Sequence, residues 1–388
     1  MDLTTAPIAR QPIAPAARLA GPDVVRGVAL IGVVVMNYHG YLLLADDTGV
    51  VIGDGWAAML FDPWRGPLST RFAATFVLVA GVGVTLLTRT AIGTPERVTA
   101  ARWRLARRGV LLYVVGLLVD EVWPGTILPY YGVMFVLAAA MFTWRTRWIV
   151  FAGVATTATA TAIHLWQFDR ERSGHRTDWL ASPSGQSIRR YVFGVFVNGT
   201  HPLLPWLSFL CAGMVLGRMM DTTAQWGQRW GKWWGKWCGH RWRRTALLGG
   251  AAMMLVAGVV STVSHHPPTR WADVVLTVTP FAGNLGFVTS ALGSALIAYA
   301  AIDWLAVRFP GATDPLRRAG QMTLSLYLLH VFVFNLVVDW WGWIEPAGLD
   351  TALAFALGFW VVAISCAVIW QRRFGRGPAE RVYRAFGG

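Results

Sequence analysis

Ten apolar stretches recur along the 388-residue chain, and most are long enough to cross a membrane as a helix. A helix needs about 20 mostly apolar residues for this, because each residue advances it by about 1.5 Å through a hydrocarbon layer about 30 Å thick. Charged residues make up only 14% of the chain, whereas soluble domains contain about 25%. We therefore expect an all-α polytopic membrane protein, a bundle of about ten transmembrane helices. The predicted spans are 26–45, 68–88, 108–122, 127–143, 148–166, 203–218, 245–263, 274–302, 321–340 and 351–370.

The basic residues gather in alternate loops between these stretches. If the N-terminus is inside, 26 of the 34 lysines and arginines lie on the cytoplasmic side, and the acidic residues of the loops lie mostly on the other side. Short basic loops are retained in the cytoplasm, so we predict that both termini are cytoplasmic. The net charge of +14 follows from the same distribution, which is why nucleic acid is not an expected partner.

The predicted spans divide the chain into a cytoplasmic tail at 1–21, a transmembrane domain at 22–371 and a basic cytoplasmic tail at 372–388. The longest outer loop, 167–202, mixes acidic and basic residues, which either neutralise one another or meet an anionic or sugar-like partner. The segment 226–242 places its tryptophans and its cations on different arcs of a helix. This pattern predicts a helix lying in the cytoplasmic interface of the membrane or, as the alternative, a helix that binds a partner.

Two polar residues, Asn37 and His39, interrupt the first predicted span. Asn37 lies about 16 Å beyond Arg26 along a helix, near the middle of the hydrocarbon layer. A polar side chain at that depth costs free energy unless it is partnered or functional. Asn37 and His39 therefore either hydrogen-bond a neighbouring helix or form part of a site.

A second polar group lies in the ninth predicted span. Thr323, Tyr327 and His330 are four and three residues apart, so they form one stripe on an otherwise apolar helix. His330 lies about 15 Å from the start of this span, at a depth that matches Asn37. Imidazole is suited to proton transfer near neutral pH, so His39 or His330 is a candidate general base acting on an amine or a hydroxyl. The alternative for each histidine is a hydrogen bond between helices.

An arginine cluster leads into the third predicted span, and its members are Arg102, Arg104, Arg107 and Arg108. Guanidinium groups bind phosphate through paired hydrogen bonds, so this cluster suits the phosphates of coenzyme A and equally suits lipid headgroups. The three cysteines have no paired spacing, and no cluster of ligands predicts a metal site. The chain also lacks a P-loop, which argues against a pump driven by ATP.

Several short motifs follow one another in a definite order along the chain. They are DVVRG at 23–27 with Asn37 eleven residues after Arg26, STRF at 69–72, FVLVAG at 76–81, ILPYYG at 127–132, HPLLPW at 201–206, and GQMTLSLY at 320–327 followed by His330. In this order they resemble the heparan-alpha-glucosaminide N-acetyltransferase-like family of the transmembrane acyltransferase superfamily, and in particular its bacterial members. The resemblance covers most of the chain.

The resemblance implies transfer of an acyl group, with acetyl the expected one, from cytosolic acyl-CoA across the bilayer to a glycan or glycolipid of the cell envelope. It also implies a multi-pass protein of the bacterial cytoplasmic (inner) membrane. Acetyl-CoA or another acyl-CoA is the expected co-substrate, and no metal is expected. Membrane lipids and the acceptor are the expected partners, with a homodimer left open beside a monomer.

The resemblance also suggests how the buried polar residues act. Asn37 would hydrogen-bond the thioester carbonyl or its oxyanion. The family pattern places a catalytic histidine eleven residues after this asparagine, where the present chain has Thr48. His39 or His330 is therefore the candidate base, with the aspartates at 46–47 as alternatives.

The remaining candidate site residues are expected to bind the two substrates. They are Arg104, Arg107 and Arg108 for the phosphates of acyl-CoA, and Arg71, Tyr327 and Trp206 for the acceptor. Two other functions fit the same polar residues: a transporter or lipid flippase whose path they line, and a non-catalytic envelope scaffold that acts through the tryptophan-rich segment. Dependence on coenzyme A separates the enzyme from the transporter.

Overall fold

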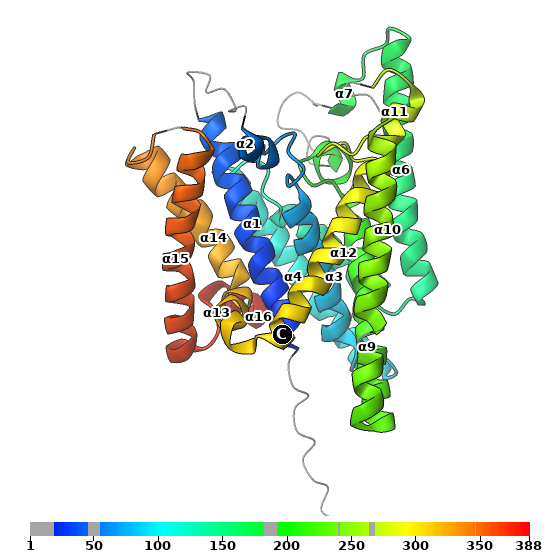
Figure 1. The fold of residues 1–388 in the computed structure, drawn as a ribbon, viewed down its shortest axis with the longest axis vertical. Coiled ribbons are helices and arrows are strands. Elements are labelled where there is room, and N and C mark those ends of the chain that lie inside the picture. The colour runs from blue at the N-terminus through cyan, green and yellow to red at the C-terminus, as the bar shows by residue number, and fades with distance from the viewer. Residues whose placement is uncertain (1–18, 46–54, 182–191, 240, 264–267, 346) are drawn as a thin grey trace, which may run out of the picture.

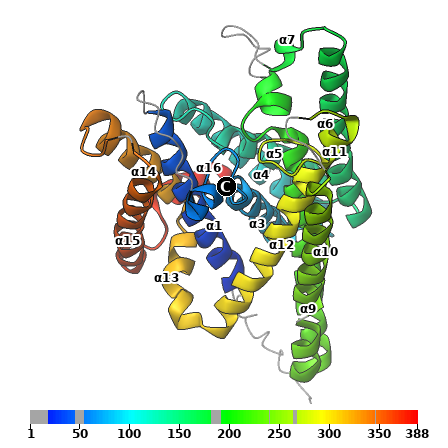
Figure 2. The ribbon, with the colours of Figure 1, turned by 45° about the horizontal axis from the view of Figure 1, so that its top comes forward.

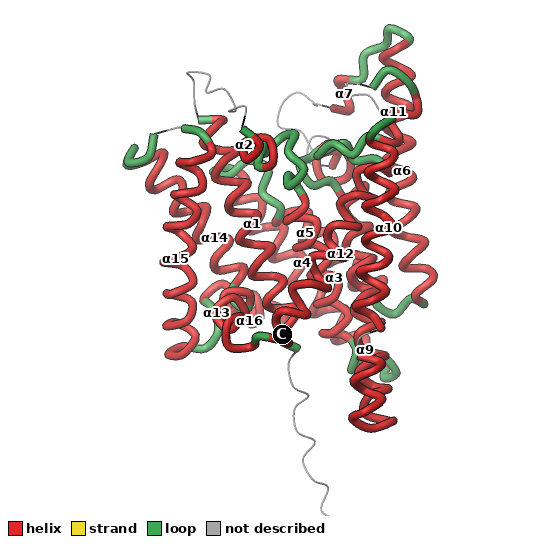
Figure 3. The backbone as a smooth tube through the Cα atoms, in the orientation of Figure 1, coloured by secondary structure: helices red, strands yellow, loops and turns green. Residues whose placement is uncertain are grey.

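The computed structural model describes residues 19–45, 55–181, 192–239, 241–263, 268–345 and 347–388, with the backbone alone at 178, 181 and 222–239. This part of the chain consists of helices and loops without a β-strand, which confirms the predicted all-α class (Figure 3). Eight of its helices are long and apolar enough to cross a membrane. The chain is therefore a multi-pass membrane protein.

The chain contains long helices and, between some of them, short elements. The long helices are α1 (Ala20–Leu44), α3 (Arg71–Thr88), α4 (Pro95–Asp120), α5 (Leu128–Met141), α6 (Thr146–Arg172), α9 (Leu203–Gly239), α10 (Arg241–Ser261), α12 (Leu285–Arg308), α14 (Thr323–Phe334) and α15 (Leu349–Phe374). The short elements are α2 (Trp56–Leu60), α7 (Asp178–Ala181), the π-helix η1 (Gly194–Asn198), α11 (Trp271–Leu276), α13 (Pro310–Gly320), the π-helix η2 (Asn335–Trp340) and α16 (Pro378–Gly387). Each predicted span lies on one or more of these helices.

Three of the predicted spans depart from a simple crossing. The first half of α4 carries the arginines, and α5 has only 14 residues, fewer than a straight crossing needs. The eighth predicted span is broken, because α11 ends at Leu276 and α12 begins at Leu285. Asn284 caps α12 by accepting a hydrogen bond from the N–H of Phe287 at 2.8 Å. The crossing of the membrane by α4 and α5 stays a prediction.

The first helix, α1, lies at the centre of the bundle (Figures 1 and 2). It packs against α3, α12, α13 and α15. In both views α14 and α15 lie on one side of α1, and α6 and α10 lie on the other. Apolar residues of α1, among them Leu30, Val34 and Leu42, belong to the main buried core. The central position of α1 explains how Asn37 comes to lie deep among several helices.

Glycines allow one of the closest contacts between helices, the crossing of α3 with α9. A Cβ atom on Gly81 would lie 2.1 Å from the carbonyl oxygen of Leu210, and one on Gly213 would lie 1.9 Å from that of Leu78. Neither position can hold a larger residue unless the two helices move apart. Small residues at such crossings let membrane helices pack closely where lipid, not water, surrounds them.

The two ends of the chain differ from the predicted tails. α1 begins at Ala20, so Arg26 lies inside it and pairs with Asp23 at 3.6 Å. The predicted basic tail, 372–388, is mostly helical, because α15 continues to Phe374 and α16 packs against α4. Residues assigned to a tail thus form part of the bundle.

Two connecting segments also differ from their predictions. α6 continues through Arg172 into the predicted outer loop at 167–202, which also contains α7 and η1. The predicted interfacial helix at 226–242 is not separate, because α9 is one helix of 37 residues that ends at Gly239. Figure 1 shows this end of α9 extending beyond the neighbouring helices. Its place at a membrane surface stays a prediction.

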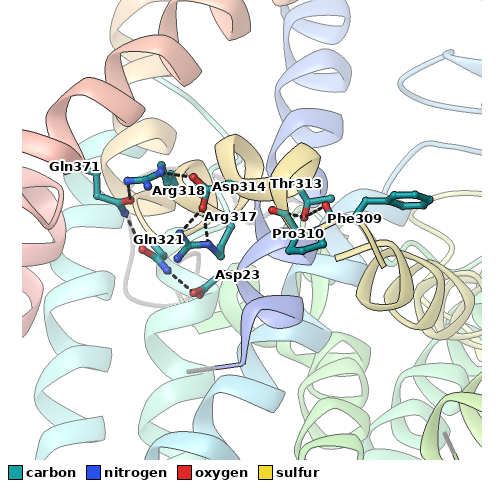
Figure 4. A network of polar contacts seen from close by, with 9 residues as sticks. All are labelled: Asp23, Phe309, Pro310, Thr313, Asp314, Arg317, Arg318, Gln321 and Gln371. Atoms are coloured by element: carbon teal, nitrogen blue, oxygen red, sulfur yellow. Dashed lines mark hydrogen bonds and ion pairs between the residues drawn. The ribbon is translucent and has the colours of Figure 1, made fainter. Parts of the chain in front are cut away.

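A chain of polar contacts ties α1, α13 and α15 together at one end of the bundle (Figure 4). The side chain of Gln321 donates to Asp23 at 2.9 Å, and Gln371 donates to Gln321 at 2.8 Å. Arg318 extends the chain by donating to Gln371 at 3.3 Å and to Asp314 at 2.6 Å. Hydrogen bonds from Arg318 and its neighbour hold the pKa of Asp314 below its usual value. We call this end, which carries α13, α16 and the start of α1, the basic end.

Candidate active site

A cavity of about 170 Å³ lies at the end of the bundle opposite the basic end, near α2 in Figure 1. α1 and α3 form two of its walls, and Tyr327 of α14 and the loops that precede α3, α5, α9 and α12 complete it. Each of these segments adjoins the same end of the bundle, so residues far apart in the sequence meet here. A cavity of about 150 Å³ can hold a benzene ring. The present cavity therefore has room for a ring-sized group.

Aromatic side chains form much of the cavity wall. They are Tyr41, Trp64, Phe72, Phe76, Trp123, Phe281 and Tyr327. Such rings present large apolar faces, and a few polar groups among them fix the orientation of a ligand. Asn37 and His201 are polar groups of this wall. Among the described residues, no group of three or more His, Cys, Asp or Glu side chains is placed to hold a metal ion.

The side chains of Asn37 and His330 form a hydrogen-bonded pair beside the cavity. His330 Nδ1 bonds the carbonyl oxygen of Tyr327, and a carbonyl oxygen only accepts, so Nδ1 carries the proton. His330 Nε2 is then an acceptor, and Asn37 Nδ2 donates to it at 3.3 Å. Asn37 lines the cavity, whereas His330 is fully buried behind it. No other described residue hydrogen-bonds the amide of Asn37, so its oxygen and its second N–H can bind a ligand.

Neighbouring contacts fix this pair in place. Tyr38, which follows Asn37, donates to the carbonyl oxygen of His330 at 3.1 Å. The ring of His330 meets those of Tyr327 and Trp123 edge to face, with centroids 4.8 and 5.5 Å apart. α14 then passes directly into η2, and such widened turns are frequent at functional sites.

The structure does not bring His39 to the cavity. Two residues along a helix turn a side chain by about 200°, so His39 points away from the face that carries Asn37. It is 2% exposed, and its Nδ1 lies 2.8 Å from the carbonyl oxygen of Phe61. This contact joins α1 to the end of α2. The alternative aspartates at 46–47, and Thr48 with them, lie outside the described residues.

The three predicted acceptor-binding residues are placed differently. Tyr327 lines the cavity, but its hydroxyl pairs at 2.8 Å with a threonine hydroxyl of the loop before α5. Trp206 is 2% exposed and lies against His201, with ring centroids 4.5 Å apart. Arg71 is not part of the wall, because it donates to Ser290 at 2.8 Å and to a carbonyl oxygen before α12 at 3.2 Å. Arg71 thus joins α3 to α12.

His201 is a polar residue of the cavity wall that was not among the predicted site residues. It opens the HPLLPW motif directly before α9 and lines the cavity. Its Nδ1 is buried without a hydrogen-bond partner among the described residues. Burial lowers the pKa of His201 to about 3, so the imidazole is neutral at ordinary pH. The feature of the sequence that could have identified it is its position in the HPLLPW motif, directly before the predicted span at 203–218.

The three predicted phosphate-binding arginines lie on α4 in different environments. Arg107 is exposed. Arg104 Nε donates to the backbone oxygen of Gly388 at 3.0 Å, and the guanidinium of Arg108 lies 5.0 Å from the ring centroid of Tyr383. Burial raises the pKa of Tyr383 to about 12, although Arg108 opposes the shift, so a neutral phenol faces the cation. α16 therefore covers two of the three arginines.

Two family models match overlapping parts of the chain. The model described as "Heparan-alpha-glucosaminide N-acetyltransferase, catalytic" matches residues 18–255, which is more than half of the chain. The model described as "Protein of unknown function (DUF418)" matches residues 229–387. A search of the curated proteins finds no match. Asn37 and His201 fall in the first match and His330 falls in the second, so the candidate site draws on both.

Proposed function

The chain belongs to the heparan-alpha-glucosaminide N-acetyltransferase catalytic family, and from this premise we propose that it is a membrane acyltransferase that uses acyl-CoA. Acetyl is the acyl group that the family description favours. The proposed acceptor is a glycan or glycolipid of the cell envelope, bound at the cavity. The proposed location is the inner membrane of a bacterium.

The observation that carries this proposal is the cavity around Asn37. It combines room for a ring-sized group, aromatic walls and an asparagine amide with unused hydrogen-bonding capacity. It also lies at the end of the bundle away from the arginines of α4, and basic loops favour the cytoplasmic side. These features support an acceptor at the cavity and a donor that arrives from the basic end.

In the proposed reaction the amine or hydroxyl of the acceptor attacks the carbonyl carbon of the thioester. The C–S bond breaks, and coenzyme A leaves as the thiol after the proton of the acceptor neutralises the thiolate. The N–H of Asn37 that His330 does not use is the donor we assign to the carbonyl oxygen, where negative charge develops. A donor preorganised in this way lowers the barrier by about 3 to 4 kcal/mol in known enzymes. His330 acts as a positioning residue, because it fixes the direction of the amide.

Binding of the donor requires a movement in this proposal. The phosphates of acyl-CoA would contact Arg104, Arg107 and Arg108, but the last turn of α16 lies on the first and third of them. We propose that a phosphate first meets the exposed Arg107 and that α16 then leaves the other two. Arg108 Nε supports this idea, because it is buried without a hydrogen-bond partner in the described structure, and a phosphate would supply one.

The test is thioester consumption by the purified full-length protein in lipid nanodiscs. The protein is given acetyl-CoA with a panel of amino sugars and envelope glycolipids, and both free thiol and acylated product are measured. We expect thiol release that depends on the acceptor. Ser365→Ala, at an exposed position of α15, is a matched control that should keep full activity. If the protein neither binds nor consumes acyl-CoA, and proteoliposomes containing it take up a solute, a transporter function replaces this one.

A further inference from the structure

We propose that His201 binds the amine or hydroxyl of the acceptor that becomes acylated, and thereby selects acceptors that hydrogen-bond at this point of the cavity. This role deepens the function proposed above and rests on it. Nothing in the family match assigns a task to His201, and its side chain is distinct from the Asn37–His330 pair.

Most hydroxyl groups of the cavity wall are already engaged by the protein. Those of Tyr41, Ser69 and Thr70 donate to backbone carbonyl oxygens, and that of Tyr327 pairs with Thr126. A hydroxyl has one proton, so a group that has donated it can only accept from a ligand. Besides the Thr200 hydroxyl and the indole N–H donors of Trp64 and Trp123, Asn37 and His201 are the other polar side chains of the wall. They can both donate and accept new hydrogen bonds, whereas an indole N–H only donates.

His201 lacks the hydrogen bonds that a histidine among packed residues normally makes. Its Nδ1 is buried with no partner among the described residues. A buried polar group without a partner costs about 1 to 3 kcal/mol. Nδ1 is closed off from the cavity, whereas Nε2 is not buried in this way and has no hydrogen-bond partner among the described residues. Because the residue lines the cavity, Nε2 is the ring atom that a ligand there would meet.

Aromatic neighbours hold the ring of His201 in a fixed orientation. Trp206 meets it edge to face at 4.5 Å between centroids, and Tyr130 lies at 5.9 Å. A rigid polar group in an apolar wall is the kind of group that sets the orientation of a ligand. The low pKa of His201, about 3, makes it a weak base. Binding in the neutral form, and not removal of a proton, is therefore the role that its surroundings support.

Two substitutions separate hydrogen bonding from packing. His201→Phe keeps a ring against Trp206 and removes both nitrogens, whereas His201→Gln restores a hydrogen-bonding group. For the acceptor that the wild type acylates, we expect His201→Phe to raise KM about tenfold with little change in kcat, and His201→Gln to recover most of this loss. The KM for acyl-CoA should stay the same, because the arginines of α4 are at the other end of the bundle.

An acceptor analogue methylated at the reacting group makes the assignment specific. Its binding is measured without acyl-CoA, through quenching of tryptophan fluorescence, since Trp64 and Trp123 line the cavity. The analogue should bind the wild type about tenfold more weakly than the parent acceptor and should show no such difference with His201→Phe. A similar loss in both proteins, or a fall in kcat alone, would overturn the proposal.

The same experiment distinguishes failure of this inference from failure of the proposed function. If the wild type consumes no acyl-CoA, the acyltransferase is wrong, while the fluorescence titration still decides whether His201 binds a sugar or glycolipid. Size-exclusion chromatography and thermal unfolding show whether each variant folds. If His201→Phe does not fold, the parent and analogue are compared on the wild type and His201→Gln, and equal binding of the two ligands by the wild type then rejects the proposal.

Discussion

The two ends of the bundle treat their polar side chains in opposite ways. At the cavity, Asn37 and His201 keep hydrogen-bonding groups that no described residue engages. At the basic end, α16 lies over Arg104 and Arg108, and only Arg107 of the predicted phosphate site is exposed. The cavity is thus ready for a ligand, whereas the arginine surface has to be uncovered. If the two ends bind acceptor and donor as proposed, the acceptor site is preformed and the donor site depends on a movement of α16.

One helix also connects the two ends. Glu380 of α16 accepts hydrogen bonds from the N–H groups of Leu324 and Ser325 at 2.7 and 3.1 Å. These groups lie in the first turn of α14, where a carboxylate satisfies free N–H donors and stabilises the helix. α14 carries His330, which fixes the amide of Asn37. α14 therefore links α16 to the residue that orients Asn37.

The largest expected effect comes from the cavity end. Asn37→Ala removes the N–H donor assigned to the thioester oxygen, so kcat should fall about a hundredfold or more while the protein still folds. The measurement is thioester turnover at saturating acceptor. Asn335→Ala is the control, because Asn335 bonds only a carbonyl oxygen of the preceding helical turn. Unchanged turnover in Asn37→Ala would show that the amide of Asn37 takes no part in the reaction. The two ends of the bundle would then not differ in the way described above.

A smaller loss, about tenfold in kcat, is expected for His330→Ala, because His330 acts by orienting Asn37. His330→Gln should recover part of the rate, since its amide oxygen can accept from Asn37. The double variant with Asn37→Ala should be no slower than Asn37→Ala alone. The pH profile of kcat should be the same in the wild type and His330→Gln. Loss of one limb of that profile would instead identify His330 as a general base.

The helices were predictable because apolar length is a local property of the sequence. The depth of a residue in the membrane also follows from its distance along the helix from the start of the span. Asn37 and His330 were predicted at matching depths in this way, and their side chains are hydrogen-bonded in the structure. The rotation of a helix about its axis depends on its neighbours and was not predictable. Asn37 and His39 point in nearly opposite directions on any helix, but which of them faces the cavity depends on this rotation. In the structure Asn37 faces it, and His39 bonds Phe61.

His201 and α16 were missed because their roles depend on contacts distant in the sequence. The unpartnered ring of His201 becomes evident only when the walls of the cavity are assembled around it. The charged composition of α16 is typical of a tail, yet it docks on α4 through a contact between residues 284 positions apart. The same contact shows why an arginine cluster in a sequence does not establish an open phosphate site.

Weakening the contact between α16 and α4 tests whether α16 keeps acyl-CoA away from the arginines. Tyr383→Ala removes the ring that lies on Arg108, and such a cation–π contact contributes about 0.5 to 2 kcal/mol. We therefore expect acyl-CoA to bind about fivefold more tightly, measured as Kd by titration calorimetry. Tyr383→Phe keeps the ring and should bind like the wild type. Weaker binding to Tyr383→Ala would make α16 a part of the donor site, and the arginine surface would no longer count as covered.

The smallest expected effect concerns stability and pH at His201. The pKa of this histidine is about 3 in the folded protein against a usual value of 6.5, so the unfolded chain takes up a proton at a higher pH than the folded one. Above pH 6.5 this difference has no effect, and below it the penalty on the folded state grows as the pH falls toward 3.

His201→Phe should therefore reduce the fall in unfolding temperature between about pH 7 and pH 4 by a few degrees. His175→Phe, at an exposed position after α6, should leave that fall unchanged. If the unfolding temperature falls equally with pH in the wild type and both variants, the folded protein protonates His201 at its usual pKa. Water would then reach its ring more readily than the burial of Nδ1 indicates.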